Sequence, residues 1–325
     1  MTQPLISVLI PCYNAARWLG DTLQSLVDQH YDALQVIVVD DGSSDDSSAI
    51  VASWQSRFRD LQLIRQKNRG KTAALNVALA QARGDYVQYL DADDVLMPGK
   101  LHAQLARLQG HPDCVAMAAW GRFHDVPANT RFDAADTWQD LAPVDWLVAD
   151  WADGGGMMFP AMWLAPMGLI RAIGPWREDL SLLDDMEYFS RLLLMSTAVL
   201  FCPEAKVGYR SGISGSLSGL KSRAAFLSGY QVLLVVECRL LAREDSDRTR
   251  RILSVLWQRF AHGCYAFFRD LAEESLARAE RLHFVVVIPA GGRLFHRIAA
   301  VIGWRLTSRM QNFLRKKCVS TREKK

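Results

Sequence analysis

Three acidic residues lie close together after one apolar run in the first third of the chain. Asp91 and Asp93 are separated by one alanine, and Asp94 comes next, directly after the run 86–90. Carboxylate oxygens are the ligands that hard divalent cations such as Mg²⁺ and Mn²⁺ prefer. A cation held there could neutralise charge that develops on a departing diphosphate. The alternative is a solvated turn in which Asp94 caps a helix that begins near Pro98.

A second acidic pair, Asp40 and Asp41, closes another apolar run, 35–39. A carboxylate at such a position can accept hydrogen bonds from a nucleobase or a ribose. The alternative is that this segment forms the cap of a helix, with Ser43 or Ser44 as the capping residue.

A lysine and a third acidic pair could complete such a site. Lys71 follows the segment Asn68-Arg-Gly70 and could approach a diphosphate, or it could be an ordinary exposed lysine. Asp184 and Asp185 begin a helical pattern. Either carboxylate could accept the proton of an attacking hydroxyl group. Alternatively, the pair could only complement the dipole of the first helical turn.

The apolar runs that carry these residues alternate with helical patterns. Strands are predicted at 5–10, 35–39, 61–65, 86–90 and 114–118. Helices are predicted at 18–27, from a cap at Ser43 or Ser44 through Ile50, Trp54 and Phe58, and at 71–83. Continuous apolar strands that alternate with helices indicate an α/β fold, with a mainly parallel sheet covered by helices on both faces. Ligands bind such sheets beyond the carboxyl ends of the strands, where the acidic residues stand.

Together these motifs resemble the family 2 glycosyltransferases of the GT-A fold, in both order and spacing. The resemblance covers roughly residues 5–220 and rests on the segments 6–14, 40–45, 68–76, 90–94 and 184–191. It implies an inverting enzyme that moves a sugar from a nucleotide-sugar donor, usually a UDP-sugar, to a hydroxyl acceptor. The QxxRW motif of the processive synthases is absent from the sequence, so we expect addition of a single sugar, in cell-surface polysaccharide or glycolipid synthesis.

The resemblance also implies roles for individual residues. The positions that match nucleoside contacts are Pro11, Tyr13 and Asp41. Asp91 matches a contact to the nucleotide, Asp93 the ligand of Mn²⁺ or Mg²⁺, and Asp185 the general base. Many members carry a histidine in the loop after Tyr209-Arg210, where this chain has Ser-Gly-Ile-Ser-Gly-Ser. Arg210 remains available to the diphosphate beside Lys71.

Two other functions fit parts of the sequence. The segment 90–95 also fits the DxDx(T/V) motif of haloacid-dehalogenase-like phosphatases, in which Asp91 would be the nucleophile beside Mg²⁺. That motif normally lies near the start of its domain, whereas three predicted strands precede it here. The other alternative is a catalytically inactive glycosyltransferase-like binding protein, against which the intact acids at every matched position argue.

Composition indicates a folded protein with unevenly spread charge. Half of the 325 residues are hydrophobic, and the formal net charge is +3. Residues 293–325 contain ten Lys or Arg and one Glu, so the rest of the chain carries a net charge of −6. We expect a GT-A domain at residues 1–222, followed by a helical region with a basic tail at 223–325.

The start of this tail is amphipathic. Its apolar residues are Leu294, Phe295, Ile298, Val301 and Ile302, and its polar ones are Arg293, His296 and Arg297. Such a segment could bind the surface of an anionic membrane and deliver the enzyme to a saccharide or lipid-linked acceptor. The alternative is a solvated basic tail.

The remaining features favour a cytoplasmic protein, and we expect no nucleic-acid partner. The six cysteines lack CxxC spacing and are expected to be reduced thiols. The N-terminus lacks the basic region of a signal peptide, and no window is expected to reach the ~20 apolar residues of a membrane span. The glycines 154–156 predict a loop or a close approach to a ligand, and 211–219 predicts a mobile loop.

Overall fold

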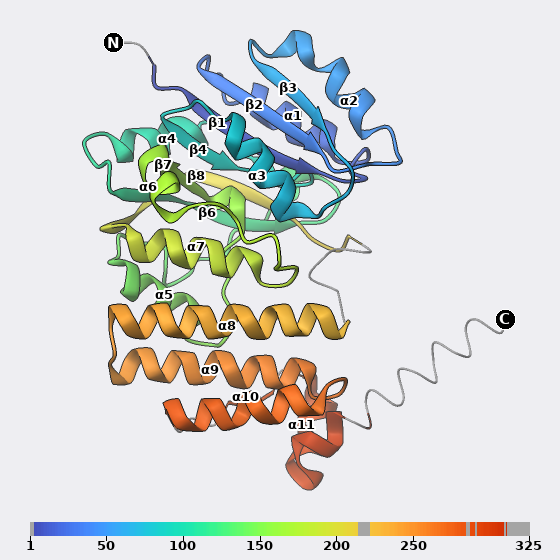
Figure 1. Cartoon of the computed structure of the whole chain (residues 1–325), viewed down its shortest axis with the longest axis vertical. Helices are drawn as coiled ribbons and strands as arrows, with labels where there is room; N and C mark the ends of the chain where they lie inside the picture. Colours follow the sequence, from blue (N-terminus) through green and yellow to red (C-terminus); the bar gives the residue numbers. More distant parts are fainter. Residues whose placement is uncertain (1–2, 214–221, 284–286, 290, 309, 311–325) are drawn as a thin grey trace, which may run out of the picture. The chain divides into compact units, whose positions relative to one another are not determined.

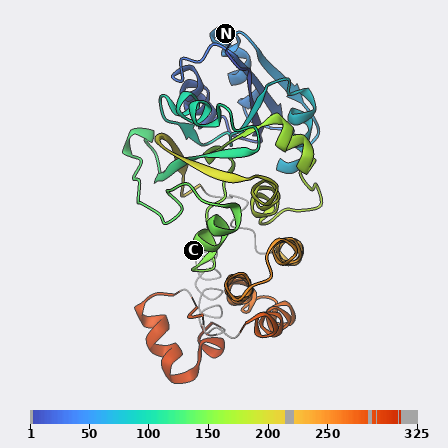
Figure 2. The ribbon, with the colours of Figure 1, turned by 90° about the vertical axis from the view of Figure 1, so that its left-hand side faces the viewer.

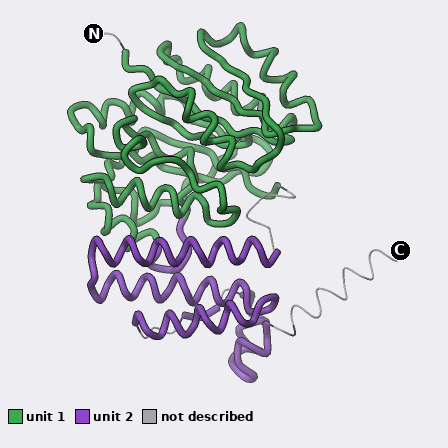
Figure 3. The backbone as a smooth tube through the Cα atoms, viewed as in Figure 1, with its two compact units in different colours: residues 1–150, 157–220 green, residues 151–156, 221–325 purple. Residues whose placement is uncertain are grey.

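The computed structural model describes residues 3–213, 222–283, 287–289, 291–308 and 310. The chain divides into two compact units, one of residues 1–150 and 157–220 and the other of residues 151–156 and 221–325 (Figure 3). The first unit contains the sheet, and the described part of the second consists of helices and loops (Figure 1). Most of the predicted loop at 211–219 lies outside the described residues.

Four parallel strands form one half of the sheet: β1 (Ile6–Cys12), β2 (Leu34–Asp40), β3 (Leu61–Arg65) and β4 (Tyr86–Tyr89). β1 pairs with β2 and β4, and β2 pairs with β3. β2 is buried along its whole length, and so is β1 except at Pro11, as expected for strands covered on both faces. The predicted α/β fold with a mainly parallel sheet is confirmed.

The other half of the sheet mixes directions. It consists of β7 (Trp163–Pro166), β6 (Cys114–Phe123), β8 (Ala198–Arg210) and β5 (Val95–Leu96). β7 runs antiparallel to β4 and β6, whereas β6 and β8 are parallel. The full order is β3-β2-β1-β4-β7-β6-β8-β5. β6 includes the strand predicted at 114–118 and extends it to Phe123.

Helices and short 3₁₀ turns connect the strands. The helices are α1 (Leu19–Val27), α2 (Ser47–Ser53), α3 (Lys71–Gln81), α4 (Lys100–Leu108), α5 (Pro143–Trp151), α6 (Met167–Ile173) and α7 (Asp184–Met195). The 3₁₀ turns span Gln55–Arg57, Pro127–Asn129 and Pro160–Met162.

The prediction that Ser43 or Ser44 caps α2 is wrong, because this helix begins only at Ser47. The two earlier serines instead bind the loop after β1. Ser43 Oγ accepts a hydrogen bond from the Asn14 amide, and the Ser44 amide donates to Asn14 Oδ1. The helix also ends at Ser53, so Phe58 is not part of its apolar face.

Three long helices of the second unit lie side by side. They are α8 (Arg223–Arg243), α9 (Asp247–Cys264) and α10 (Arg269–Leu282), seen from the side in Figure 1 and end-on in Figure 2, and α11 (Arg293–Ile302) follows them. Trp257 links all three long helices, because its ring packs 5.0 Å from that of Tyr230, its indole donates to Glu237, and Arg278 lies over it. The predicted helical C-terminal region is confirmed.

α8 is long and apolar enough to cross a membrane by length and composition, with a mean hydropathy of 1.5 over its best window. On that criterion, the expectation that no such segment exists is wrong. However, 56% of the same window is buried, as in a core helix of a folded domain. The buried residues of α8 include Val232, Leu233 and Leu240.

The glycine segment 154–156 approaches protein. Gly154 has a positive φ of 74°, and a Cβ atom there would lie 2.2 Å from Arg259 Cγ and 2.8 Å from Val255 Cγ1. Only glycine tolerates both the backbone conformation and this contact with α9. Gly154 therefore approaches α9, and the alternative of a close approach to a ligand stays a prediction.

Candidate functional site

The polar segments that follow β1, β2 and β4 meet at one edge of the sheet. These strands are parallel and in register, with Cys12 opposite Asp40 and Leu9 opposite Tyr89. Their carboxyl ends therefore project the segments after Cys12, Asp40 and Tyr89 to the same side (Figure 1).

Asp41 fastens the loop that leads into α3. Its carboxylate is only 3% exposed and accepts hydrogen bonds from Gln66 Nε2 at 2.7 Å and from the amides of Arg69 and Gly70 at 2.8 Å. Asp41 thus positions the first residue of α3, Lys71. Its role as a nucleoside contact stays a prediction.

The two residues matched to nucleoside contacts on β1 lie at the same edge. Pro11 is the second-to-last residue of β1, and Tyr13, which follows the strand, is 55% exposed. The next residue, Asn14, has a positive φ of 50° and joins this loop to Ser43 and Ser44. An exposed aromatic ring on a well-anchored loop is suited to stacking against a nucleobase.

Two residues, Thr22 and Arg210, make hydrogen bonds to the turn 91–94. Thr22 Oγ1, on α1, lies 2.9 Å from the carbonyl oxygens of both Ala92 and Asp94. Arg210 donates to the carbonyl oxygen of Asp93 at 2.9 Å, and its amide donates to Asp94 Oδ1. These contacts fix the direction in which the carboxylates of the turn point.

The side chain of Arg210 is buried against the turn 91–94. Its side chain is 3% exposed, pairs with Asp21 at 2.8 Å, and donates to the carbonyl oxygen of Asp125 at 3.0 Å. The guanidinium is therefore occupied by protein groups. Its contact with a diphosphate stays a prediction, because in this structure the guanidinium contacts Asp21 and the backbone of Asp93 and Asp125.

Crowded carboxylates make the turn suitable for a cation. Burial, together with the neighbouring Asp91 carboxylate, raises the pKa of Asp93 to about 6. Burial also raises the pKa of Asp94 well above its usual range, with Asp93 and Asp91 adding to the effect. A divalent cation would relieve this repulsion.

Within the described residues, no three acidic, histidine or cysteine side chains form a ready-made metal site. A cation of the Mg²⁺ type typically uses one or two carboxylates and completes its shell with water and substrate phosphates. Asp93, with Asp91 nearby, could supply such a partial site.

Lys71 connects this turn to the start of α7. Its Nζ lies 3.0 Å from Asp91 Oδ2 and 3.3 Å from Asp185 Oδ1, and all three side chains are partly buried. Burial alone would lower the pKa of Lys71, but the carboxylates of Asp185 and Asp91 raise it well above its usual value. Burial raises the pKa of Asp185 to about 8, although the Lys71 charge opposes this rise. Asp185 therefore has the proton affinity of a general base that works near neutral pH.

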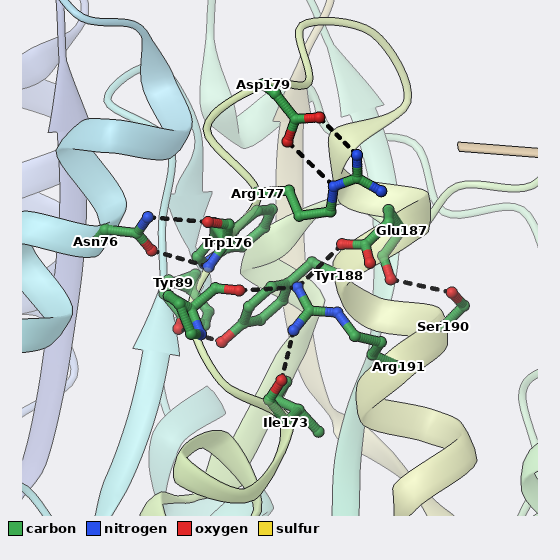
Figure 4. Close-up of polar contacts among 11 residues, drawn as sticks. Asn76, Tyr89, Ile173, Trp176, Arg177, Asp179, Glu187, Tyr188, Ser190 and Arg191 are labelled. Carbon is green, nitrogen blue, oxygen red and sulfur yellow. Dashed lines mark hydrogen bonds and ion pairs between the residues drawn. The ribbon is translucent and has the colours of Figure 1, made fainter. Parts of the chain in front are cut away.

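The first turn of α7 is fixed by a buried ion pair. Arg191 binds Glu187 Oε2 at 2.9 Å, and the two side chains are 11% and 1% exposed. The same guanidinium donates to the carbonyl oxygens of Ile173 at 2.5 Å and Pro175 at 2.9 Å (Figure 4). Leu183, which precedes the helix, has a left-handed φ of 61°, a strained conformation for leucine. Several contacts therefore fix the start of α7, which carries Asp185.

Aromatic packing and Asn76 fix the segment around Trp176, which packs against α7. The rings of Trp176 and Tyr188 stack at 3.8 Å with an interplanar angle of 1°, and Tyr89 Oη lies 2.6 Å from Tyr188 Oη. Asn76, on α3, binds the amide of Trp176 at 2.8 Å and its carbonyl oxygen at 2.9 Å (Figure 4). The helices that carry Lys71 and Asp185 are thereby fastened to the same segment.

The sequence indicated no role for four of these positioning residues, namely Thr22, Asn76, Glu187 and Arg191. The i,i+4 spacing of Glu187 and Arg191 on a predicted helix was a usable signal for their pairing. The contacts of Thr22 and Asn76 join segments 70 and 100 residues apart, so no local pattern indicates them.

Comparisons with known proteins agree with this arrangement. Residues 7–147 match the family described as "Glycosyl transferase family 2". A glycosyltransferase of Haemophilus influenzae, described as uncharacterized, is 38% identical over 113 residues, which are 34% of this chain and 45% of that protein. The putative teichuronic acid biosynthesis glycosyltransferase TuaG of Bacillus subtilis is 36% identical over 104 residues, 32% of this chain and 41% of that protein. The matched part is thus less than half the length of these relatives.

Two solved structures resemble the whole chain. S. aureus TarS 1-349, in complex with UDP-GlcNAc, matches with a TM-score of 0.70 and 17% identity, over 95% of this chain and 89% of that one. The mannosyltransferase PcManGT from Pyrobaculum calidifontis, in complex with GDP-Man and Mn²⁺, matches with a TM-score of 0.55 and 19% identity, over 96% and 88%. At such identities the likeness concerns the fold. The family match therefore identifies residues 7–147 as a family 2 glycosyltransferase region, and the likeness to these structures shows that the chain has a GT-A-like fold.

Proposed function

We propose that this protein is an inverting, metal-dependent glycosyltransferase that moves one sugar from a UDP-sugar donor to a hydroxyl acceptor. The observation that carries the proposal is the double ion pair of Lys71. Its ammonium joins Asp91, in the turn of the candidate cation ligand, to Asp185, the candidate base. Groups for the donor and for the acceptor therefore lie within a few ångströms of one point.

The proposed reaction is a direct displacement. The acceptor oxygen attacks the anomeric carbon while Asp185 takes the hydroxyl proton. A new glycosidic bond forms on the face opposite the departing group, the bond to the diphosphate oxygen breaks, and the nucleoside diphosphate leaves with both electrons. The configuration at the anomeric carbon is inverted.

Other residues of the edge would bind and orient the donor. Tyr13 and Pro11 offer a surface to the base, and Asp41 holds the loop that presents Lys71 to the diphosphate. Asp93 would hold Mn²⁺ or Mg²⁺, which supplies positive charge to the leaving diphosphate. UDP-GlcNAc in the TarS structure supports the choice of a UDP-sugar, and Mn²⁺ in the PcManGT structure supports the choice of metal.

The acceptor is proposed to be a saccharide or lipid-linked precursor of a cell-surface polysaccharide or glycolipid. The similarity to TuaG, whose name assigns it to teichuronic acid biosynthesis, supports this class. Synthesis of such precursors uses cytoplasmic nucleotide sugars, so we place the protein in the cytoplasm.

A donor screen tests the proposal. The protein is incubated with Mn²⁺ and a panel of nucleotide sugars, with simple saccharides as acceptors, and released nucleoside diphosphate is measured. We expect release from one UDP-sugar, faster with acceptor present. Nucleotide binding without turnover of any donor, across a broad acceptor panel, would favour the inactive binding protein. The glycosyltransferase family match includes the whole segment 90–95, which argues against the phosphatase alternative.

A further inference from the structure

The two faces of α11 differ in what they contact. Phe295 is 7% exposed and lines a cavity of about 530 Å³, which is also lined by Ala299 of α11 and by Gln258, His262 and Ala279 of α9 and α10. This face accounts for the packing of α11 within its own unit. On the opposite face of α11, Leu294 and Val301 are not buried by other described residues.

That opposite face is apolar and exposed. Leu294 and Val301, seven residues apart and so on one side of the helix, are 71% and 84% exposed. Beyond Gly303, Leu306 and Met310 are each 51% exposed. Of the eleven large apolar side chains exposed in the described residues, six lie between 288 and 310. Such a concentration, unlike single surface leucines, marks an interaction surface.

Basic residues border the apolar strip. Arg293 and Arg297 are exposed and lie about a quarter-turn or less from Leu294 and Val301 on the helix. Arg305 is exposed just beyond the helix end. The sequence from 293 onward has ten Lys or Arg and a single Glu. The surface thus combines aliphatic side chains with a positive border, and no acidic residue of α11 offsets it.

We propose that α11 docks this protein on the surface of a bilayer that contains anionic lipids. Aliphatic side chains enter the boundary between headgroups and acyl chains, while arginines extend to the phosphates. Charge and side-chain type favour a membrane surface over a second copy of the chain or a nucleic acid. A second copy would bring the same positive segment against itself, and nucleic acid would favour exposed aromatic rings over aliphatic ones. Docking does not depend on the proposed function, although it would bring a glycosyltransferase close to a lipid-linked acceptor.

Flotation of the full-length protein with vesicles tests the proposal. Vesicles of phosphatidylcholine alone are compared with vesicles that also contain phosphatidylglycerol. We expect recovery with the anionic vesicles only, decreasing as salt is raised. The double variant Leu294→Ser with Val301→Ser should bind roughly tenfold more weakly or worse. Arg293→Gln with Arg297→Gln should also lose roughly tenfold or more.

Matched controls separate docking from general surface effects. Val126→Ser with Met195→Ser removes two other exposed apolar side chains, 51% and 52% exposed, from the other unit. Arg171→Gln with Arg281→Gln removes the same charge from exposed positions elsewhere. Both controls should bind vesicles like the unmodified protein. Equal recovery with neutral and anionic vesicles, or equal loss in test and control variants, would overturn the proposal. It would also be overturned if Leu294→Ser with Val301→Ser dissociated a dimer in analytical ultracentrifugation and left vesicle binding unchanged.

Discussion

Lys71 Nζ lies 3.3 Å from Asp185 Oδ1, although the two residues are 114 positions apart in the chain. The same ammonium pairs with Asp91, so it connects the nucleotide-side turn to the candidate base. A diphosphate carries more charge than either carboxylate and should draw Lys71 toward itself. Donor binding is then expected to weaken the Lys71–Asp185 pair and free the base for the acceptor.

Removal of the base should stop transfer without loss of donor binding. Asp185→Asn is expected to lower kcat by about 10²–10⁴-fold, the usual contribution of a positioned general base. UDP affinity should not fall, because Asp185 competes with the diphosphate for Lys71 and does not itself hold the donor. Asp184→Asn is the matched control and should retain most activity. Equal losses in both variants, or loss of UDP binding in Asp185→Asn, would place these acids in the donor site.

The pH dependence of transfer should report the same carboxylate. Because burial raises the pKa of Asp185 to about 8, the charged form that acts as base increases as pH rises toward 8. We expect kcat/KM for the acceptor to rise about tenfold per pH unit well below 8 and to level off above it.

Two variants should move the midpoint of this profile in opposite directions. The Lys71 charge lowers the pKa of Asp185 and the Asp184 charge raises it. Lys71→Met should therefore move the midpoint to higher pH, and Asp184→Asn should move it to lower pH. A profile that neither variant displaces would show that another group controls the rate.

Asp93→Asn should stabilise the metal-free protein. Three carboxylates crowd the turn 91–94, and a neutral side chain at 93 removes part of their mutual repulsion. The gain in the free energy of unfolding at neutral pH is expected to be about 1 kcal/mol. Urea unfolding in the presence of EDTA measures it. A variant less stable than the parent would mean that Asp93 makes a structural contact essential to the turn.

The buried and exposed arginine pairs near α7 should differ sharply in their contribution to stability. Arg191→Met removes the arginine that pairs with Glu187, which is 1% exposed, and should cost about 3–5 kcal/mol. Arg177→Met breaks a pair with Asp179 whose side chains are 35% and 59% exposed, and it should cost less than ~1 kcal/mol. Both pairs appear in Figure 4. Similar costs in chemical denaturation would contradict the assigned importance of the Glu187–Arg191 pair for the start of α7.

The parallel half of the sheet and its acidic edge were predictable from the sequence for a local reason. Each of β1, β2 and β4 is a continuous apolar run, and each ends where polar residues begin. Once the strands are parallel, their ends must share an edge. Asp41 and Asp91 could therefore be placed at this edge before their neighbours were known, whereas Asp185, at the start of α7, was singled out by the resemblance to the family.

The rest depended on partners distant in sequence. The boundaries of α2 were missed because Ser43 and Ser44 bind Asn14 rather than their own helix. Arg210 was expected among the diphosphate contacts, and only the tertiary structure reveals that Asp21 and the Asp93 backbone occupy it. Gly154 indicated a close approach, but not that α9 makes it. Local patterns identify which residues are unusual, and the fold decides what they contact.

Calorimetric titration of UDP, with Mn²⁺ or with EDTA, into the unmodified protein and into Asp93→Asn measures whether donor binding at the acidic edge depends on a cation. We expect binding that requires Mn²⁺ in the unmodified protein and is lost in Asp93→Asn. Binding of UDP that is equally strong with EDTA, or unaffected by Asp93→Asn, would contradict the proposal that a cation and a diphosphate meet at this acidic edge.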